Sequence, residues 1–178
     1  MSVDRYCSHC GEAMTIALLG GRERHQCAAC GFVLWKNPAP VGMALIGHEG
    51  RLVLIRRAAA PLAGYWAPPA GYVECGESVP DAVMREAREE CGLEIVLDGL
   101  LGVYSQPDVD VDVIAIAYTA HATGGQLAAG DDAVDARLFA RDDLPAQLPP
   151  TGGTATDLWF HAAITDCLVR WRETTPKE

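Results

Sequence analysis

Long hydrophobic runs are absent from this sequence of 178 residues, since no apolar stretch reaches the roughly 18 residues that cross a bilayer. The N-terminus, MSVDRYCSHC, likewise lacks the apolar core of a secretory signal. Internal repeats and low-complexity tracts are also missing. These absences argue against a membrane-spanning protein and a repeat array, and they lead us to expect a cytoplasmic protein.

Positive charge is scarce as well. The chain has 14 lysines and arginines against 24 aspartates and glutamates, which gives a formal net charge of −10. Such a surface disfavours general binding to nucleic acid or to anionic membranes, so we expect neither as a partner. Apolar residues make up 49% of the chain, which is ordinary, and the length predicts one medium domain with a small appendage. If the substrate is anionic, cations must stand between it and this protein.

The seven cysteines are arranged as two close pairs and three isolated residues. Cys7/Cys10 and Cys27/Cys30 both have CxxC spacing, and sixteen residues separate the pairs. In an intracellular chain this pattern predicts a tetrahedral thiolate zinc site, with a redox dithiol or a site that has lost its metal as alternatives. Because four cysteines fill the coordination shell, such a zinc ion would stabilise the fold and would not catalyse.

The cysteine pairs define a zinc ribbon over residues 1–36, which is too small to bury a core without metal. Residues 37–178 form the main domain, and near its start a pair of apolar runs flanks a polar turn at residues 48–50, which predicts a β-hairpin. Further strands are predicted over residues 92–106, 110–122 and 133–139, with a short helix after the last strand and a C-terminal helix over residues 154–173. Together with the helix described next, this order predicts an α/β domain with a mixed sheet.

A helix over residues 79–91 has clear start and stop signals. Ser78, with Asp81 three residues later, makes a capping box, and Pro80 is tolerated in the first helical turn. Gly92 is a typical residue just after a helix end.

Three glutamates of this helix lie close together on the helical wheel. Glu86, Glu89 and Glu90 fall within an arc of about 100°, at the edge of the apolar stripe, while Arg85 and Arg88 point roughly the other way. A solvated surface would keep its carboxylates away from the buried stripe and alternate them with basic residues. Crowded carboxylates at a core edge are instead stabilised by a divalent cation, and oxygen ligands favour magnesium or manganese.

The same stretch resembles the Nudix box, G-x5-E-x7-R-E-U-x-E-E-x-G-U with U apolar, at all nine defined positions. The matching residues are Gly71, Glu77, Arg85, Glu86, Ala87, Glu89, Glu90, Gly92 and Leu93. The resemblance implies an α/β/α sandwich, here preceded by a zinc ribbon. It also implies an enzyme that cleaves the pyrophosphate of a nucleoside diphosphate linked to another moiety.

The resemblance also implies roles for individual residues. Glu86, Glu89 and Glu90 would hold the divalent cations with the backbone carbonyl of Ala70, and either Glu86 or Glu89 would be the catalytic base. Glu77 and Arg85 would form the ion pair that fixes the helix. A later loop usually adds another carboxylate to the metal site, and Asp132 aligns with it. Asp131 and Asp135 are rivals for that role, and a plain solvated turn is the alternative.

Substrate class rests on a narrower resemblance. NADH pyrophosphatases with a zinc ribbon carry S-Q-P-W-P-F-P-x-S after the box, whereas this chain has Ser105-Gln106-Pro107 followed by DVDVD. The compact ribbon and the ARLF element look closer to the smaller FAD and ADP-ribose pyrophosphatases. We therefore expect FAD or ADP-ribose as the substrate, with NADH as the alternative. The weaker candidates for substrate contact are Arg56, Arg57, Tyr65, Trp66 and Tyr104; ordinary packing is the favoured alternative for each aromatic residue, and a surface role is the alternative for the arginines.

A non-enzymatic hypothesis is a nucleic-acid adaptor built on an inactive Nudix scaffold. Residues 1–38 have a net charge of only about +1, which provides no electrostatic surface for a phosphate backbone. The intact box also argues against loss of activity. A small nucleotide derivative is thus the expected partner, and Trp159 and Trp171 of the C-terminal helix are candidates for core or homodimer contacts.

Overall fold

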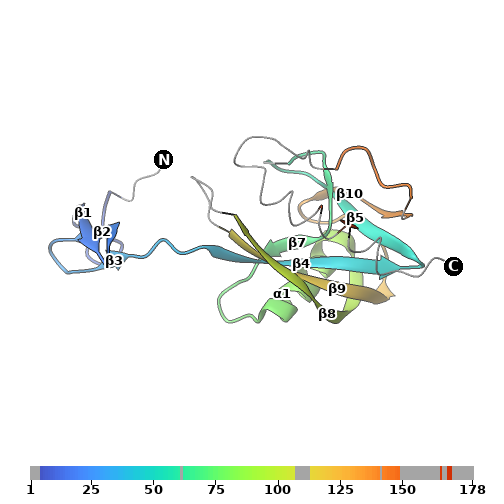
Figure 1. Ribbon diagram of the computed structural model, residues 1–178, viewed down its shortest axis with the longest axis horizontal. Coiled ribbons are helices and arrows are strands. Elements are labelled where there is room, and N and C mark those ends of the chain that lie inside the picture. The colour runs from blue at the N-terminus through green and yellow to red at the C-terminus, as the bar shows by residue number, and fades with distance from the viewer. Residues whose placement is uncertain are drawn as a thin grey trace. The chain divides into compact units, whose positions relative to one another are not determined.

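The computed structural model describes residues 5–60, 62–106, 113–140 and 142–148, together with Thr165, Leu168 and Val169. The chain divides into two units, residues 1–37 and residues 38–178, which are described separately below (Figure 1). The boundary predicted after residue 36 lies next to this division. Within the described residues, no helix has both the length and the apolar character needed to span a membrane.

The N-terminal unit is a three-stranded antiparallel sheet of β1 (Met14–Leu19), β2 (Arg22–Cys27) and β3 (Val33–Leu34). Tight turns bring each cysteine pair together, because the N–H groups of Gly11 and Gly31 donate to the carbonyls of Cys7 and Cys27 at 2.8 and 2.9 Å. Both glycines have φ close to 80°, a conformation that L-residues rarely adopt. The sheet leaves its large side chains Ile16 and Leu18 exposed, so its own apolar core is small.

The second unit contains a seven-stranded mixed sheet. Its strands are β4 (Ala39–His48), β5 (Arg51–Arg57), β6 (Trp66–Ala67), β7 (Ala70–Tyr72), β8 (Leu93–Gln106), β9 (Val113–Gly125) and β10 (Ala133–Phe139). The order is β10-β5-β4-β9-β8, with β6 paired to β5 and β7 paired to β4. β4 and β9 run parallel, and the other pairs are antiparallel. The predicted hairpin, the other three strands and the mixed sheet are therefore confirmed.

The predicted helix after β10 is not found, because the described residues 142–148 are turns and irregular structure. Three prolines and two aspartates in DDLPAQLPP explain the difference, since they favour turns over a helix. The predicted C-terminal helix lies largely outside the described residues, and so do Trp159 and Trp171. Thr165, Leu168 and Val169 are helical.

β8 forms one edge of the described sheet and is irregular along its length. Its pairing with β9 shifts register at three places, between Glu94 and Ile95, between Leu97 and Gly99, and between Leu100 and Gly102. Each shift marks a bulge or another irregularity in the ladder. Three apolar side chains of this strand are about half exposed: Val96, Leu100 and Val103.

Helix α1 (Val79–Cys91) begins and ends at the predicted residues. Ser78 has an extended backbone, and its hydroxyl oxygen accepts a hydrogen bond from the Asp81 N–H at 3.3 Å. Gly92 adopts a left-handed conformation with φ of 71°, and its N–H donates to the Arg88 carbonyl at 3.0 Å. These contacts satisfy backbone groups that a helix end leaves without intrahelical partners.

Each face of the sheet is covered by a separate apolar cluster. On one face Val83, Ala87 and Cys91 of α1 pack with residues that include Ala44, Ile46, Val53 and Ile55. The α1 helix approaches β4 closely because Gly42 has no side chain, and a Cβ there would lie 2.6 Å from Val83 Cγ2. The other cluster contains Met43, Leu45, Leu52, Leu54 and the helical residue Leu168. This helix, sheet, helix layering confirms the predicted α/β/α sandwich class.

Candidate active site and metal centre

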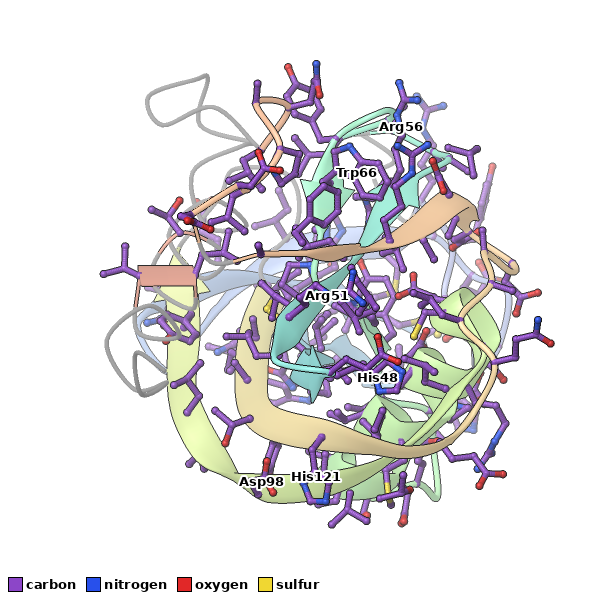
Figure 2. All side chains as sticks on the ribbon, turned by 90° about the vertical axis from the view of Figure 1, so that its right-hand side faces the viewer. His48, Arg51, Arg56, Trp66, Asp98 and His121 are labelled. Atoms are coloured by element: carbon purple, nitrogen blue, oxygen red, sulfur yellow. The ribbon has the colours of Figure 1, made fainter. Side chains whose placement is uncertain are left out.

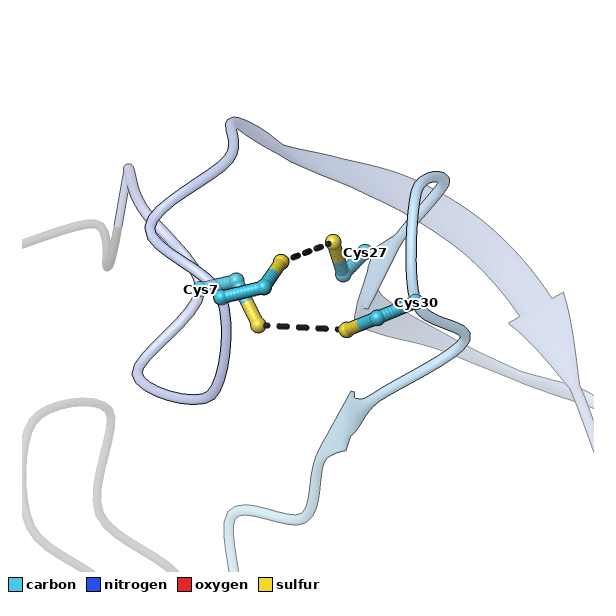
Figure 3. Close-up of side chains that lie close together, drawn as sticks. Cys7, Cys27 and Cys30 are labelled. Carbon is cyan, nitrogen blue, oxygen red and sulfur yellow. Dashed lines mark hydrogen bonds between the residues drawn. The ribbon is translucent and has the colours of Figure 1, made fainter.

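The four ribbon cysteines converge on one point. Their sulfur atoms all lie within 4.8 Å of one another, with Cys7 Sγ 3.7 Å from Cys30 Sγ and Cys10 Sγ 3.4 Å from Cys27 Sγ (Figure 3). Tetrahedral thiolates about 2.3 Å from a zinc ion would be about 3.8 Å apart, so this cluster fits a metal ion. A hydrogen bond from the Cys30 backbone N–H lowers the pKa of the Cys27 thiol to about 7, whereas the pKa values of Cys10 and Cys30 are raised by their crowding against the other thiols, despite backbone hydrogen bonds that lower them. Four thiolates in this space therefore need the positive charge of a metal ion.

The α1 glutamates meet strand β7 at the point where the sheet and the helix pack together. The Glu90 side chain is buried, with the residue only 3% exposed, and its Oε2 accepts a hydrogen bond from the Ala70 N–H at 2.9 Å. The Glu86 carboxylate lies directly against Gly71, where a Cβ would collide with it. A side chain at residue 71 would therefore displace the Glu86 carboxylate from its place against the strand.

Arg85 lies at the centre of a charged network. Its Nε and Nη2 donate to the two carboxylate oxygens of Glu77 at 2.9 and 3.1 Å, and Nη2 also donates to the Tyr72 carbonyl at 3.0 Å. Its Nη1 donates to Glu86 Oε1 at 2.7 Å and to Glu89 Oε2 at 2.8 Å. The guanidinium thus ties α1 to β7 and to the loop before the helix.

The direction of the Arg85 side chain corrects one expectation. The helical wheel predicted that Arg85 would point away from the glutamates, and this is wrong for the guanidinium group. A wheel places the Cα atoms, whereas the long arginine side chain folds back to carboxylates one and four residues further along.

Burial and charge shift the pKa values of these groups in opposite directions. The Arg85 guanidinium lowers the pKa of Glu77, and in return Glu77 raises the pKa of Arg85. Burial raises the pKa of Glu86 despite its contact with Arg85. Burial also raises the pKa of Glu90 to about 7, and the nearby charge of Glu86 adds to the shift. Two of the three clustered carboxylates are therefore costly to ionise without a further cation.

Among the described residues, the cysteine thiols are the one group whose ligand atoms already lie close enough together to hold a metal ion. The three α1 carboxylates are instead held by protein donors, with Glu86 and Glu89 on Arg85 and Glu90 on the Ala70 N–H. The helix brings the three side chains to one region, but it does not point their oxygens at one centre.

The three candidate aspartates of the later loop are placed differently. Asp135 is paired with Arg137 Nη2 at 2.6 Å. Asp131 has a left-handed backbone with φ of 37°. The Asp132 carbonyl accepts a hydrogen bond from the Ala58 N–H at 2.7 Å, and its negative charge contributes to the raised pKa of Glu90. Asp132 therefore lies within electrostatic reach of the α1 carboxylates.

The aromatic candidates for substrate contact are mainly packed in the core. Trp66 is 5% exposed, and its ring meets that of Phe139 edge-on with centroids 4.9 Å apart. This burial favours a packing role for Trp66 over stacking on a base. Tyr65 and Tyr104 are half-buried and pack against the same apolar cluster.

The two arginine candidates lie in adjacent positions at the end of β5. Arg56 is exposed, pairs with Trp66 across the β5–β6 ladder, and donates from Nε to the Gly64 carbonyl at 3.0 Å (Figure 2). The charge of Arg57 reaches the helix carboxylates, where it lowers the pKa of Glu90. Of the two arginines, Arg57 is the one whose charge acts on a clustered glutamate.

A cavity of about 410 Å³ opens where β4 turns into β5, and none of the predicted site residues lines it. His48 and Arg51 border it at the turn, and Asp98 and His121 border it on β8 and β9 (Figure 2). His121 Nδ1 lies 2.7 Å from Asp98 Oδ1. Arg51 begins β5 and Arg57 ends it, so this cavity and the α1 carboxylates lie at opposite ends of that strand. The lining residues are far apart in sequence and carry no motif that could have grouped them.

Two known protein families match this chain. Residues 36–159 match the NUDIX domain family, and residues 5–35 match the family described as Nudix N-terminal. The chain belongs to the Nudix family, as its resemblance to the box predicted, and it carries the zinc ribbon that precedes the domain in some members.

The chain is similar to several characterised or solved proteins. It is 44% identical over 114 residues to an ADP-ribose pyrophosphatase of Methanocaldococcus jannaschii, covering 63% of this chain and 68% of that protein. It is 31% identical to the NAD-capped RNA hydrolase NudC of Pseudomonas aeruginosa over 80% of this chain, but spans only 50% of that protein. A NUDIX hydrolase structure from Nitrosomonas europaea has a TM-score of 0.81 at 26% identity, covering 95% of this chain and 90% of that one.

Proposed function

We propose that this chain is a divalent-cation-dependent pyrophosphohydrolase that acts on ADP-ribose or FAD. The observation that carries the proposal is the pair of desolvated carboxylates, Glu86 and Glu90, packed against β7 beside the exposed carboxylate of Glu89. A divalent cation relieves both their burial and their mutual repulsion, and hard oxygen donors suit magnesium or manganese. The similarity to an ADP-ribose pyrophosphatase supports the choice of substrate.

Five residues would hold the cations in this proposal: Ala70 through its carbonyl, and Glu86, Glu89, Glu90 and Asp132 through their carboxylates. When bound, the cations neutralise charge on the pyrophosphate and lower the pKa of a coordinated water. An excess of negative charge on the protein is then compatible with an anionic substrate.

Side chains of the protein would orient the ligands, accept a proton from water and contact the phosphate. Arg85 orients Glu86 and Glu89 while it is anchored on Glu77. The Glu89 side chain is 42% exposed and that of Glu86 is 14% exposed. Glu89 is therefore better placed to take a proton from an attacking water, and Glu86 is better placed as a buried ligand. Arg57, whose charge reaches Glu90, would contact a phosphate oxygen of the substrate in this proposal.

For the ribbon we propose a structural zinc ion on Cys7, Cys10, Cys27 and Cys30. Four thiolates leave no open coordination position for chemistry. The six cysteines that the structure describes are all free thiols, which suits a reducing compartment such as the cytoplasm. The ribbon has little apolar core of its own, so the metal would supply much of its folding free energy.

The test is a hydrolysis panel of ADP-ribose, FAD, NADH, NAD, NADPH and nucleoside triphosphates at one magnesium concentration. We expect kcat/KM for ADP-ribose or FAD to exceed that for NADH by about tenfold, which corresponds to about 1.4 kcal/mol in transition-state binding. NADPH and the triphosphates should be poor substrates, since Asp108, Asp110 and Asp112 add negative charge after Pro107. These four residues lie outside the described ranges of the chain. Preference for NADH would replace the assignment with that of an NADH pyrophosphatase.

A further inference from the structure

The C-terminal end of α1 is hydrogen-bonded to residues 126–130, which directly follow β9 in the sequence. The N–H groups of Gln126, Ala128 and Gly130 donate to the carbonyls of Gly92, Cys91 and Glu90 at 3.2, 3.1 and 3.2 Å. Donors two residues apart thus meet three successive carbonyls that the helix end leaves without intrahelical partners. We call residues 126–130 the helix strap.

Gly130 is the point of closest approach between the strap and the helix. A Cβ at this position would collide with the carbonyl oxygen of Glu89. Gly130 does not have the positive φ that favours glycine, so its backbone conformation is open to alanine and only the contact forbids a side chain. Space, and not backbone freedom, therefore selects glycine here.

The strap leads directly into the turn that carries Asp132. The Ala133 N–H donates to the Gly130 carbonyl at 2.9 Å, which closes a four-residue turn with Asp131 and Asp132 at its centre. On its other side, Asp132 is fixed by the hydrogen bond from the Ala58 N–H to its carbonyl. Asp132 is therefore located relative to both α1 and β5 by backbone contacts.

We propose that Gly130 is a positioning residue, which lets the strap approach the helix closely enough to set the Asp132 carboxylate against the carboxylates of α1. The proposal rests on the proposed function, because it takes Asp132 as a cation ligand. It is supported by the reach of the Asp132 charge to Glu90, and by the use of the rival Asp135 in a pair with Arg137. Residues that support metal ligands typically change metal affinity by about 10-fold to 100-fold when replaced.

The test compares Gly130→Ala with Gly99→Ala in the full chain. Gly99, in β8, has open space where a Cβ would be added, so the same chemical change meets nothing within 4 Å. Binding of Mn²⁺ alone, followed by electron paramagnetic resonance, should weaken by about tenfold in Gly130→Ala and stay at the wild-type value in Gly99→Ala. Thermal unfolding of each variant shows whether the fold is retained. Wild-type affinity in Gly130→Ala would overturn the proposal.

A double variant separates positioning from a general loss of structure. In an Asp132→Asn background, Gly130→Ala should cause no further loss of Mn²⁺ affinity, because both changes act on one ligand. A second full tenfold loss would mean that Gly130 acts elsewhere, and the proposal would fail.

Hydrogen exchange of the wild type covers the case in which Gly130→Ala does not fold. The amides of Ala128 and Gly130 should exchange slowly, because both are bonded to helix carbonyls. Exchange as fast as in an unstructured peptide would overturn the proposal without any variant. Hydrolysis by the wild type separates failure of the proposed function from failure of the positioning role. If Gly130→Ala weakens Mn²⁺ binding but the wild type cleaves no pyrophosphate, the proposed function fails and the positioning role stands.

Discussion

Glu90 combines a carboxylate with almost complete burial, and its protonation therefore affects folding. Its pKa is about 7 in the folded protein against an ordinary value of 4.5. Between these two values the folded state keeps a proton that the unfolded chain has released. The free energy of unfolding must then fall as the pH rises from about 4.5 to about 7, and it remains lower above that range.

Replacing this group tests the linkage directly. In buffer without magnesium or manganese, Glu90→Gln should be more stable than the wild type at pH 8. The difference in free energy of unfolding between the two proteins should be smaller at pH 5.5 than at pH 8, by up to about 2 kcal/mol for the raised pKa of Glu90. Urea unfolding of both proteins at the two pH values measures it. An equal difference at both pH values would show that Glu90 is not protonated in the folded state.

Glu89 is the residue through which the proposed chemistry is most simply tested. Glu89→Gln keeps the size of the side chain and removes its charge, so we expect kcat to fall by at least about 10²-fold while the fold is retained. Steady-state hydrolysis at saturating magnesium measures the loss. Glu74→Gln is the matched control, an exposed glutamate of the same stretch that is not a predicted ligand. Activity of Glu89→Gln within a few-fold of the wild type would remove α1 from the mechanism.

The sequence predicts the Cα positions of the charged residues, but it does not predict where the charged ends of their side chains lie. Glu86, Glu89 and Glu90 share one arc because helical periodicity fixes their Cα positions. Helical periodicity does not fix the position of the Arg85 guanidinium, because several rotatable bonds separate this group from its Cα. The burial of Trp66 could not be predicted either, because the proline-rich loop that contains it shows no periodicity from which to infer an inward side chain.

Helix α1 and the longer strands were predictable for local reasons. The start and stop of α1 are set by Ser78, Asp81 and Gly92, which act within one helical turn. The short strands β6 and β7, and the register shifts of β8, were not predictable. They depend on pairing with strands far away in the sequence, and no local pattern encodes them.

The packing of α1 on β4 depends on a glycine at the contact. Gly42→Ala would place a methyl group 2.6 Å from Val83 Cγ2, so we expect a loss of about 1–3 kcal/mol in the free energy of unfolding. Chemical denaturation measures the loss. Gly47→Ala in the same strand is the control, because its Cβ would meet its nearest atom at an ordinary 3.8 Å.

A compensating change sharpens this test. Val83→Ala removes the methyl groups that the new Cβ would meet, so the double variant should be more stable than the sum of the two single losses predicts. Strict additivity would place the strain of Gly42→Ala somewhere other than the contact with α1.

The whole chain consists of two units whose stability has different sources. The N-terminal sheet has little apolar core and would depend on the proposed zinc ion, whereas the larger unit has two apolar clusters. Metal analysis after dialysis should therefore find about one zinc ion per chain and no tightly held magnesium, since magnesium binds through few protein ligands. Absence of zinc from protein purified without chelators would contradict the ribbon assignment.

Removal of zinc should then unfold one unit alone. Cys7→Ser with Cys27→Ser should abolish zinc binding and the β1–β2 pairing, which amide exchange measured by nuclear magnetic resonance would show. Hydrolysis at saturating magnesium should stay within a few-fold of the wild type, because the proposed catalytic ligands all lie in the larger unit. Loss of hydrolysis in proportion to zinc would contradict this independence.

The irregular edge strand β8 has a consequence for the behaviour of the protein at high concentration. A straight outer strand with exposed Val96, Leu100 and Val103 would be a template on which another molecule could add a strand and begin to aggregate. Two of the three register shifts add a residue to β8, Asp98 and Leu101, and they interrupt its row of backbone donors and acceptors. An incoming strand could therefore form only short runs of hydrogen bonds before losing alignment. Removing Asp98 and Leu101 should therefore straighten this edge and promote polymerisation of the protein.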